Sequence, residues 1–143
     1  MEISLNRPKL KKGFTFVELV VSIAILGILA MVAVPAYMIY TKRAAIRTTE
    51  SNLEAVKTTL MSYHSDVGDY PKALEDLVDR PKDVPARKWN GPYFDKGVPK
   101  DGWNHELEYQ VTKGAKHPYE LFSWGPAGVD SEDGQISVWE VGT

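Results

Sequence analysis

The chain begins with a short polar segment, after which apolar residues dominate a long stretch. From Leu19 to Tyr40 there are 22 positions without a charged side chain. At about 1.5 Å per residue, a helix of this length crosses a bilayer core of about 30 Å. Glu18 lies at the edge of the stretch, where a carboxylate is costly in lipid, so the pattern marks it as a functional candidate.

The apolar stretch runs into an amphipathic one. Between Thr41 and Asp66 the apolar residues recur at spacings of 7, 3, 4 and 3, which predicts a helix with one buried face. They are Ile46, Leu53, Val56, Leu60 and Tyr63. One long helix is therefore predicted over residues 14–64. Gly27 and Pro35 are its weak points, and we expect a kink or local melting near residues 27–36.

Turn residues end this helix and open an irregular region. Gly68 suits a left-handed cap and Pro71 cannot continue a helix. Leu74 and Leu77 predict one short helix. Residues 79–104 show no hydrophobic period and predict a long ordered loop. Its aromatic residues, which we expect to pin it, are Trp89, Tyr93, Phe94 and Trp103.

Alternating polar and apolar residues predict three strands in the last third of the chain. Their ranges are 106–111, 119–124 and 136–141. The fold class predicted is α+β. A long N-terminal helix, apolar in one half and amphipathic in the other, packs on a small three-stranded antiparallel sheet with a long ordered loop.

Charge and composition narrow the function. Residues 1–13 carry four basic residues and one acidic residue, a net charge of +3, whereas the remainder has 13 basic and 18 acidic residues, a net charge of −5. The remainder therefore lacks the basic surface that nucleic-acid binding requires. The chain has no cysteine, so a bound ion, neighbours in an assembly or the long helix must stabilise the small domain.

A chain cut between Gly13 and Phe14 would answer the question of what pairs with Glu18. The cut creates an α-ammonium group on Phe14, four residues before the carboxylate. In a low dielectric, such opposite charges attract far more strongly than in water. The amine reaches Glu18 of its own helix or of a neighbour. Proteolysis would then control assembly.

The run from Gly13 to Leu19 resembles the prepilin peptidase motif of type IV pilins and type II secretion pseudopilins, and Pro35 matches the helix proline of that family. The resemblance covers about residues 7–45. It implies cleavage after Gly13 and methylation of the Phe14 amine by a prepilin peptidase and methyltransferase. It also implies assembly, through Glu18 and Pro35, into a helical fibre drawn from the inner membrane.

A second resemblance, to the major pseudopilin of type II secretion, covers the C-terminal part. It rests on the segments Gly68–Pro71, Trp89–Phe94 and Asp101–Asn104. The chain departs from the family's Asp-Pro-Trp-Gly turn at Gly102 and Asn104. The resemblance implies a pilin-like subunit of a homo-oligomeric periplasmic fibre that drives export across the outer membrane. Its implied partners are minor pseudopilins and an inner-membrane assembly platform.

Together the two resemblances divide the chain into four parts. Residues 1–13 are a leader peptide, and residues 14–40 are a transmembrane and fibre-core helix. Residues 41–66 are the amphipathic half of the helix, and residues 67–143 are a periplasmic globular domain. The implied localisation is the inner membrane, crossed once.

An acidic loop near the C-terminus is a candidate calcium site. Three acids occur within four residues among glycines, and calcium takes 6–8 oxygen ligands. The major pseudopilins carry calcium here, but this chain has Ala127, Gly134 and Gln135 in the ligand region. Asp130 and Asp133 are the remaining ligands, with Ser131, Glu132 or carbonyl groups helping. The alternative is a solvated acidic turn.

Other interpretations stay open at the level of the sequence. An ordinary secretory signal would be cut after Ala36. A type IV pilin for adhesion, motility or DNA uptake shares the N-terminal motif. A membrane-anchored binding module, with aromatic residues as a carbohydrate platform, is a third class. Catalysis has little support, because the chain lacks metal-ligand spacing, a nucleophile motif and a phosphate-binding glycine loop.

Overall fold

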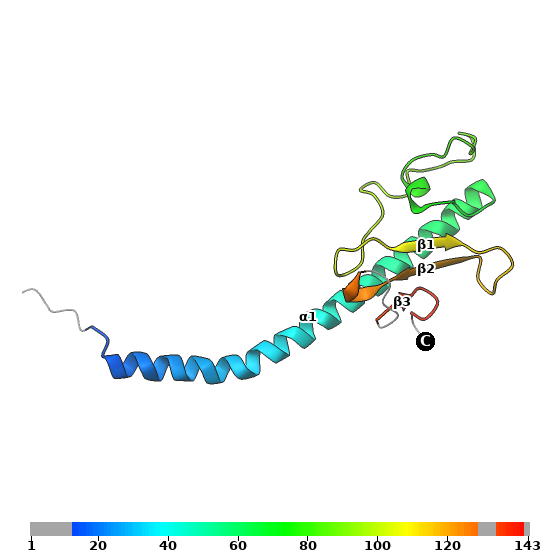
Figure 1. The fold of residues 1–143 in the computed structure, drawn as a ribbon. Helices are drawn as coiled ribbons and strands as arrows, with labels where there is room; N and C mark the ends of the chain where they lie inside the picture. The colour runs from blue at the N-terminus through cyan, green and yellow to red at the C-terminus, as the bar shows by residue number, and fades with distance from the viewer. Residues whose placement is uncertain (1–12, 129–133, 142–143) are drawn as a thin grey trace, which may run out of the picture. The chain divides into compact units, whose positions relative to one another are not determined.

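The structure, a computed structural model, describes residues 13–128 and 134–141. Two compact units divide the chain, residues 1–40 and residues 41–143. Helix α1 spans Phe16–Val67 and contributes to both (Figure 1). It begins two residues later and ends three residues later than the predicted 14–64.

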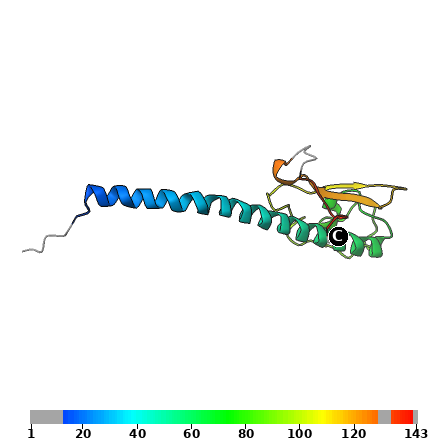
Figure 2. The same ribbon diagram turned by 90° about the horizontal axis from the view of Figure 1, so that it is seen from below.

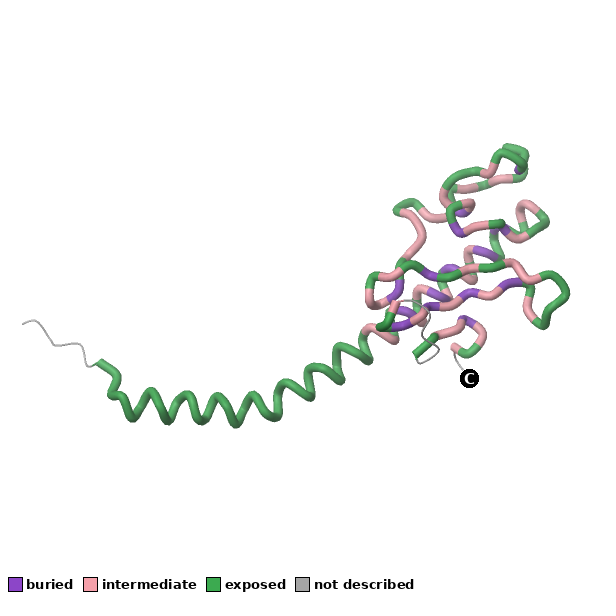
Figure 3. The backbone as a smooth tube through the Cα atoms, viewed as in Figure 1, coloured by how far each residue is buried: buried purple, intermediate pink, exposed green. Residues whose placement is uncertain are grey.

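In the first unit, every described residue from 13 to 40 is exposed (Figure 3). Within the described residues, α1 is the one helix that is long and apolar enough to cross a membrane. The helix continues through Gly27 and Pro35, so local melting, one of the two predicted outcomes, is wrong, and the kink stays a prediction. A proline removes one backbone donor, and the many hydrogen bonds on either side of Pro35 hold the helix together.

The second unit is built on the amphipathic half of α1. Leu53, Val56, Leu60 and Tyr63 are buried as their spacing predicts, whereas Ile46 is half-buried. These side chains pack with buried residues from the rest of the unit. Those residues are Leu74, Leu77, Val84, Leu107, Tyr119, Leu121 and Val138. The apolar stripe of the helix thus forms one side of the core.

The sheet is antiparallel, in the order β1-β2-β3, and lies along the second half of α1 (Figure 2). Strand β1 spans Glu108–Val111, β2 spans Tyr119–Ser123 and β3 spans Ile136–Ser137. In the register, Tyr109 is opposite Leu121, and Phe122 is opposite Ser137. The side chains of Tyr119, Leu121 and Ser123 point into the core.

The third strand is shorter than the predicted 136–141. After Ser137 the chain turns, and Glu140 N–H donates to the Ser137 carbonyl. The Trp139 ring stacks on His117 at 4.0 Å between centroids, and its Nε1 donates to the Tyr119 carbonyl. Packing of this tryptophan outweighs the alternating pattern that predicted a longer strand.

Two of the four aromatic residues that the sequence singles out, Trp89 and Tyr93, hold the long loop. The 3₁₀ helix η1, Leu74–Leu77, precedes it. Tyr93 N–H donates to the Leu77 carbonyl and the Tyr93 hydroxyl donates to Asp66 at 2.8 Å. Trp89 packs edge-to-face against Tyr93, and its Nε1 donates to the Asp76 carbonyl. The loop is thereby fixed to α1 and η1.

Candidate functional site

The predicted processing site lies just before helix α1. Gly13, Phe14 and Thr15 are non-helical and exposed. A Cβ atom on Gly13 would meet no atom within 4 Å. The peptide bond between Gly13 and Phe14 is therefore free of the helical hydrogen bonds that begin a few residues later. A peptidase that binds an extended substrate can reach it without unfolding α1.

Glu18 takes part in a capping box at the start of α1. Glu18 N–H donates to the Thr15 hydroxyl at 3.2 Å, and Thr15 N–H makes a long bond of 3.5 Å to Glu18 Oε2. Thr15 is the N-cap and Glu18 is the third helical residue, so each satisfies a backbone donor of the other. The Thr-x-x-Glu spacing signals this role for Thr15, which the charge pattern alone does not reveal.

The capping box leaves the Glu18 carboxylate able to bind a neighbouring cation. A carboxylate has about four acceptor positions, so one long bond leaves most of its capacity free. The positive end of the helix dipole also favours a negative charge here. Pro35, the other residue predicted to act in assembly, lies within α1 and is exposed. The geometry does not test the roles predicted for these residues.

A buried polar cluster ties the start of the second unit together. Asp101 Oδ1 accepts hydrogen bonds from the backbone N–H groups of Trp103 and His105, at 2.9 and 2.8 Å. Asp101 Oδ2 accepts the Ser123 hydroxyl at 2.6 Å, and the carboxylate side chain has no exposed surface. Next to it, Gly102 N–H donates to the buried Thr49 hydroxyl of α1.

This cluster has the residue types of a hydrolase triad without its geometry. The His105 ring faces the Gly125 carbonyl at 3.2 Å and lies 3.6 Å from Asp101, whereas Ser123 donates to Asp101 and is fully buried. The buried carboxylate, and not the histidine, accepts the serine hydroxyl, so the arrangement lacks the serine–histidine contact that activates a nucleophile. What it does is hold together α1, the turn at 101–105 and the end of β2.

The two predicted calcium ligands, Asp130 and Asp133, lie outside the described residues. The flanks of their loop are described. The 3₁₀ helix η2, Gly125–Ala127, precedes the loop, and a Cβ atom on Gly125 would lie 2.4 Å from the Gly134 carbonyl. The two described flanks, at Gly125 and Gly134, therefore lie against each other. Among the described residues there is no group of three or more His, Cys, Asp or Glu side chains that could hold a metal.

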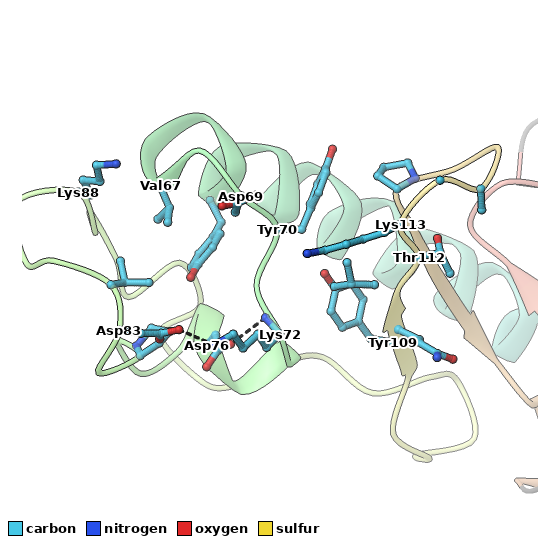
Figure 4. Close-up of a pocket in the computed structure, with 18 of the residues that line it drawn as sticks. Val67, Asp69, Tyr70, Lys72, Asp76, Asp83, Lys88, Tyr109, Thr112 and Lys113 are labelled. Carbon is cyan, nitrogen blue, oxygen red and sulfur yellow. Dashed lines mark hydrogen bonds and ion pairs between the residues drawn. The ribbon is translucent and has the colours of Figure 1, made fainter.

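A groove of about 1090 Å³ lies between β1 with its hairpin and residues 69–88 (Figure 4). Tyr63, Tyr70 and Tyr109 contribute to its lining, and Lys72 pairs with Asp83 across one side at 2.5 Å. Tyr109 donates its hydroxyl to the Pro71 carbonyl. Burial raises the pKa of Tyr63 to about 12 and raises that of Tyr109 further, so both phenols stay neutral and serve as packing and hydrogen-bonding groups.

Two family models match the chain. A prokaryotic N-terminal methylation motif matches residues 8–34, and type II secretion system protein G matches residues 36–139. The chain belongs to the type II secretion system protein G family. The family resemblance seen in the sequence is thereby confirmed.

Relatives in the protein G family match over nearly their full length. Type II secretion system core protein G of Pseudomonas aeruginosa is 33% identical over 137 residues, covering 91% of this chain and 96% of the relative. The protein of the same name from Escherichia coli K12 is 32% identical over 133 residues, covering 90% of this chain and 91% of the relative.

A solved structure carries the same fold. It is the crystal structure of the major pseudopilin from the type 2 secretion system of enterohaemorrhagic Escherichia coli, with a TM-score of 0.59 and 26% identity. The match covers 71% of this chain and 92% of that chain. The predicted α+β fold is confirmed, and the N-terminal apolar helix makes the chain a membrane-anchored member of the protein G family.

Proposed function

We propose that this protein is the structural subunit of a type II secretion pseudopilus. The precursor lies in the inner membrane until prepilin peptidase removes residues 1–13 and the Phe14 amine is methylated. The mature subunits then assemble into a helical fibre that drives protein export across the outer membrane. The observation that supports the proposal is the exposed, non-helical Gly13–Phe14 bond next to a carboxylate-capped apolar helix, in a chain of the protein G family.

The N-terminus of the mature protein tests the processing step. Mass spectrometry should find N-methyl-Phe14 as the first residue when the full chain is expressed with a prepilin peptidase. A chain that starts at Met1, or at Tyr37 after an ordinary signal cleavage, would contradict the proposal. Deletion of the gene should abolish export of secreted proteins and leave surface pili intact, which separates a pseudopilin from a type IV pilin.

Glu18 is proposed to pair with the Phe14 amine of a neighbouring subunit. Two substitutions separate this role from helix capping. Glu18→Gln keeps the capping box, because glutamine also serves at this position, and removes the charge. Glu18→Ala removes both. We expect both variants to be cleaved and to remain in the membrane, and neither to enter fibres. Wild-type fibre yield for Glu18→Gln would show that capping is the role of this residue.

We also propose that Asp130 and Asp133 hold calcium in the mature domain. The donor set of this segment consists of oxygens alone, from two aspartates, Ser131 and Glu132, which fits a hard cation. A bound ion would stabilise a small domain that has no disulfide. Chelation should lower the melting temperature of the wild-type chain and leave that of Asp130→Asn/Asp133→Asn unchanged. An equal response of both chains, or of neither, would exclude the site.

The proposed partners follow from the same function. They are further copies of the chain, minor pseudopilins, the prepilin peptidase and methyltransferase, and an inner-membrane assembly platform. In this arrangement residues 67–143 lie in the periplasm on the surface of the fibre.

A further inference from the structure

The groove beside β1 has a free strand edge along one side. Thr112 N–H donates to the Pro118 carbonyl, so the alternation of antiparallel pairs directs the backbone groups of Glu108 and Gln110 toward β2. The backbone groups of Tyr109 and Val111 therefore point away from β2. Among the described residues, no strand pairs with this edge. An exposed edge beside an aromatic floor is suited to an extended peptide segment.

Lysine side chains line this groove. Lys113 and Lys116 come from the hairpin that joins β1 to β2, and Lys72 and Lys88 come from the opposite side. Figure 4 shows the Lys113 side chain extending toward Tyr70. Three aspartates share the groove, so its lining carries one net positive charge, whereas the chain after residue 13 carries a net charge of −5. An acidic segment is the complementary ligand.

The chain itself contains such a segment, at residues 130–133, with three acids in four residues. The described flanks of this segment are at the far end of β2 from the lysine hairpin. Five residue steps separate Ser123 from Pro118, about 17 Å at ~3.3 Å per residue, and Lys113 and Lys116 lie beyond Pro118.

A contact within one molecule is excluded by the reach of the segment. Six residue steps join Gly128 to Gly134, and both ends lie near Gly125. A loop that returns to its origin extends at most about 10 Å, because half of its steps lead outward. That is less than the distance to the hairpin of the same copy.

We infer that the groove binds the acidic segment 130–133 of a second copy of this chain. This inference rests on the proposed function, since a fibre of identical subunits brings the two surfaces together. The donor and acceptor surfaces differ, so the contact is heterologous and repeats from copy to copy without closing, as an open helical fibre requires. Asp130 and Asp133 are the two carboxylates proposed to hold calcium, whereas Glu132 only assists in that site, so Glu132 is the partner for Lys113.

Cysteine pairs test the contact, because the natural chain has none. The full chain carrying Lys113→Cys and Glu132→Cys is expressed with the prepilin peptidase, assembled and oxidised. A disulfide requires Cα atoms within about 7 Å, so only a contact between copies joins these two positions. We expect a ladder of dimers, trimers and longer products on a non-reducing gel. The matched control, Lys96→Cys with Glu132→Cys, should give a several-fold lower yield.

Charge exchange provides a second test that does not depend on cysteines. Lys113→Glu and Glu132→Lys should each lower the yield of sheared fibres about two- to fivefold, as expected for loss of an exposed ion pair. The double variant should restore it. Failure of the double variant to recover, or equal ladders from both cysteine pairs in fibre-containing samples, would overturn the contact. Absence of fibres from the wild-type chain would instead refute the proposed function, which the same samples report through N-methyl-Phe14 and pelleted fibre.

Discussion

Removing the Asp101 carboxylate should destabilise the second unit more than any change on its surface. Asp101→Ala leaves three polar groups without their acceptor, namely two backbone N–H groups and the Ser123 hydroxyl. An unsatisfied buried group costs about 1–3 kcal/mol. Because His105 is partly exposed and water can enter beside it, the lower part of this range applies. We expect a loss of about 3–5 kcal/mol in the free energy of unfolding.

A conservative substitution separates charge from hydrogen bonding. In Asp101→Asn the amide oxygen still accepts the two backbone N–H groups, and the amide nitrogen meets the Ser123 oxygen as a donor. The expected loss is about 1–2 kcal/mol, the cost of one reorganised hydrogen bond. Glu106→Ala, an exposed change five residues away, should stay within about 0.5 kcal/mol of the wild type.

Tryptophan fluorescence during urea unfolding of the full chain in detergent provides the measurement. All four tryptophans lie in residues 41–143, so the signal reports the second unit and not the apolar helix. Since domains of this size are stable by about 5–15 kcal/mol, the predicted change is a large fraction of the total. A loss below about 1 kcal/mol for Asp101→Ala would refute the view that this carboxylate holds the cluster together.

Three further predictions concern the same unit. Leu60→Ala, at a fully buried position of α1, should cost about 2–5 kcal/mol in urea unfolding, and an unchanged midpoint would contradict the packing described. Gly102→Ala should prevent close contact with α1, because its Cβ atom would lie 2.0 Å from the Ala45 carbonyl; a normal melting temperature would refute this. Alkaline pH should destabilise the unit. Tyr63 and Tyr119 keep their protons to about pH 12 when folded but lose them near pH 10 when unfolded. Their contribution to the free energy of unfolding is complete below pH 10 and is lost between pH 10 and 12, up to about 3 kcal/mol each. The urea midpoint should therefore fall over this range, and Tyr119→Phe should make the fall smaller.

The sequence predicts the elements of this fold that depend on hydrophobic period. The spacing of Leu53, Val56, Leu60 and Tyr63 identifies the buried face of α1 because a helix repeats every 3.6 residues. The order and pairing of the three strands follow from their alternation and their succession along the chain. The prediction makes the third strand too long. Trp139 stacks on His117 instead of continuing the strand, and alternation does not reveal such a contact.

The candidate site could be predicted in part. The offset between Gly13, Phe14 and Glu18 is a local pattern and is legible without a structure. The capping role of Thr15 follows from the spacing of Thr15 and Glu18 once the start of the helix is known. By contrast, the groove and the Asp101 cluster join segments far apart in sequence. Thr49 and Gly102 are 53 positions apart, and no local pattern in either segment predicts the hydrogen bond between them.

Close packing also explains one departure from the family turn. Gly102 departs from the Asp-Pro-Trp-Gly turn of the family that the sequence resembles, and its backbone lies directly against the Ala45 carbonyl. Any side chain at this position would meet the backbone of α1. The substitution therefore accompanies a close approach between the turn and the helix, which a single sequence does not reveal.

The exposed apolar half of α1 constrains how assembly can be driven. In the proposed pseudopilus, residues 14–40 exchange lipid contacts for contacts with other helices, and lipid tails are as apolar as leucine. The exchange therefore provides little hydrophobic free energy. Near the start of α1 the Ser22 hydroxyl is bonded to the Glu18 carbonyl, and the Thr15 hydroxyl caps the helix. The Glu18 carboxylate is the one charged side chain between residues 14 and 40, and it also has acceptor capacity to spare. In the proposed assembly it is this charge, rather than the apolar length of the helix, that distinguishes a processed neighbour from lipid.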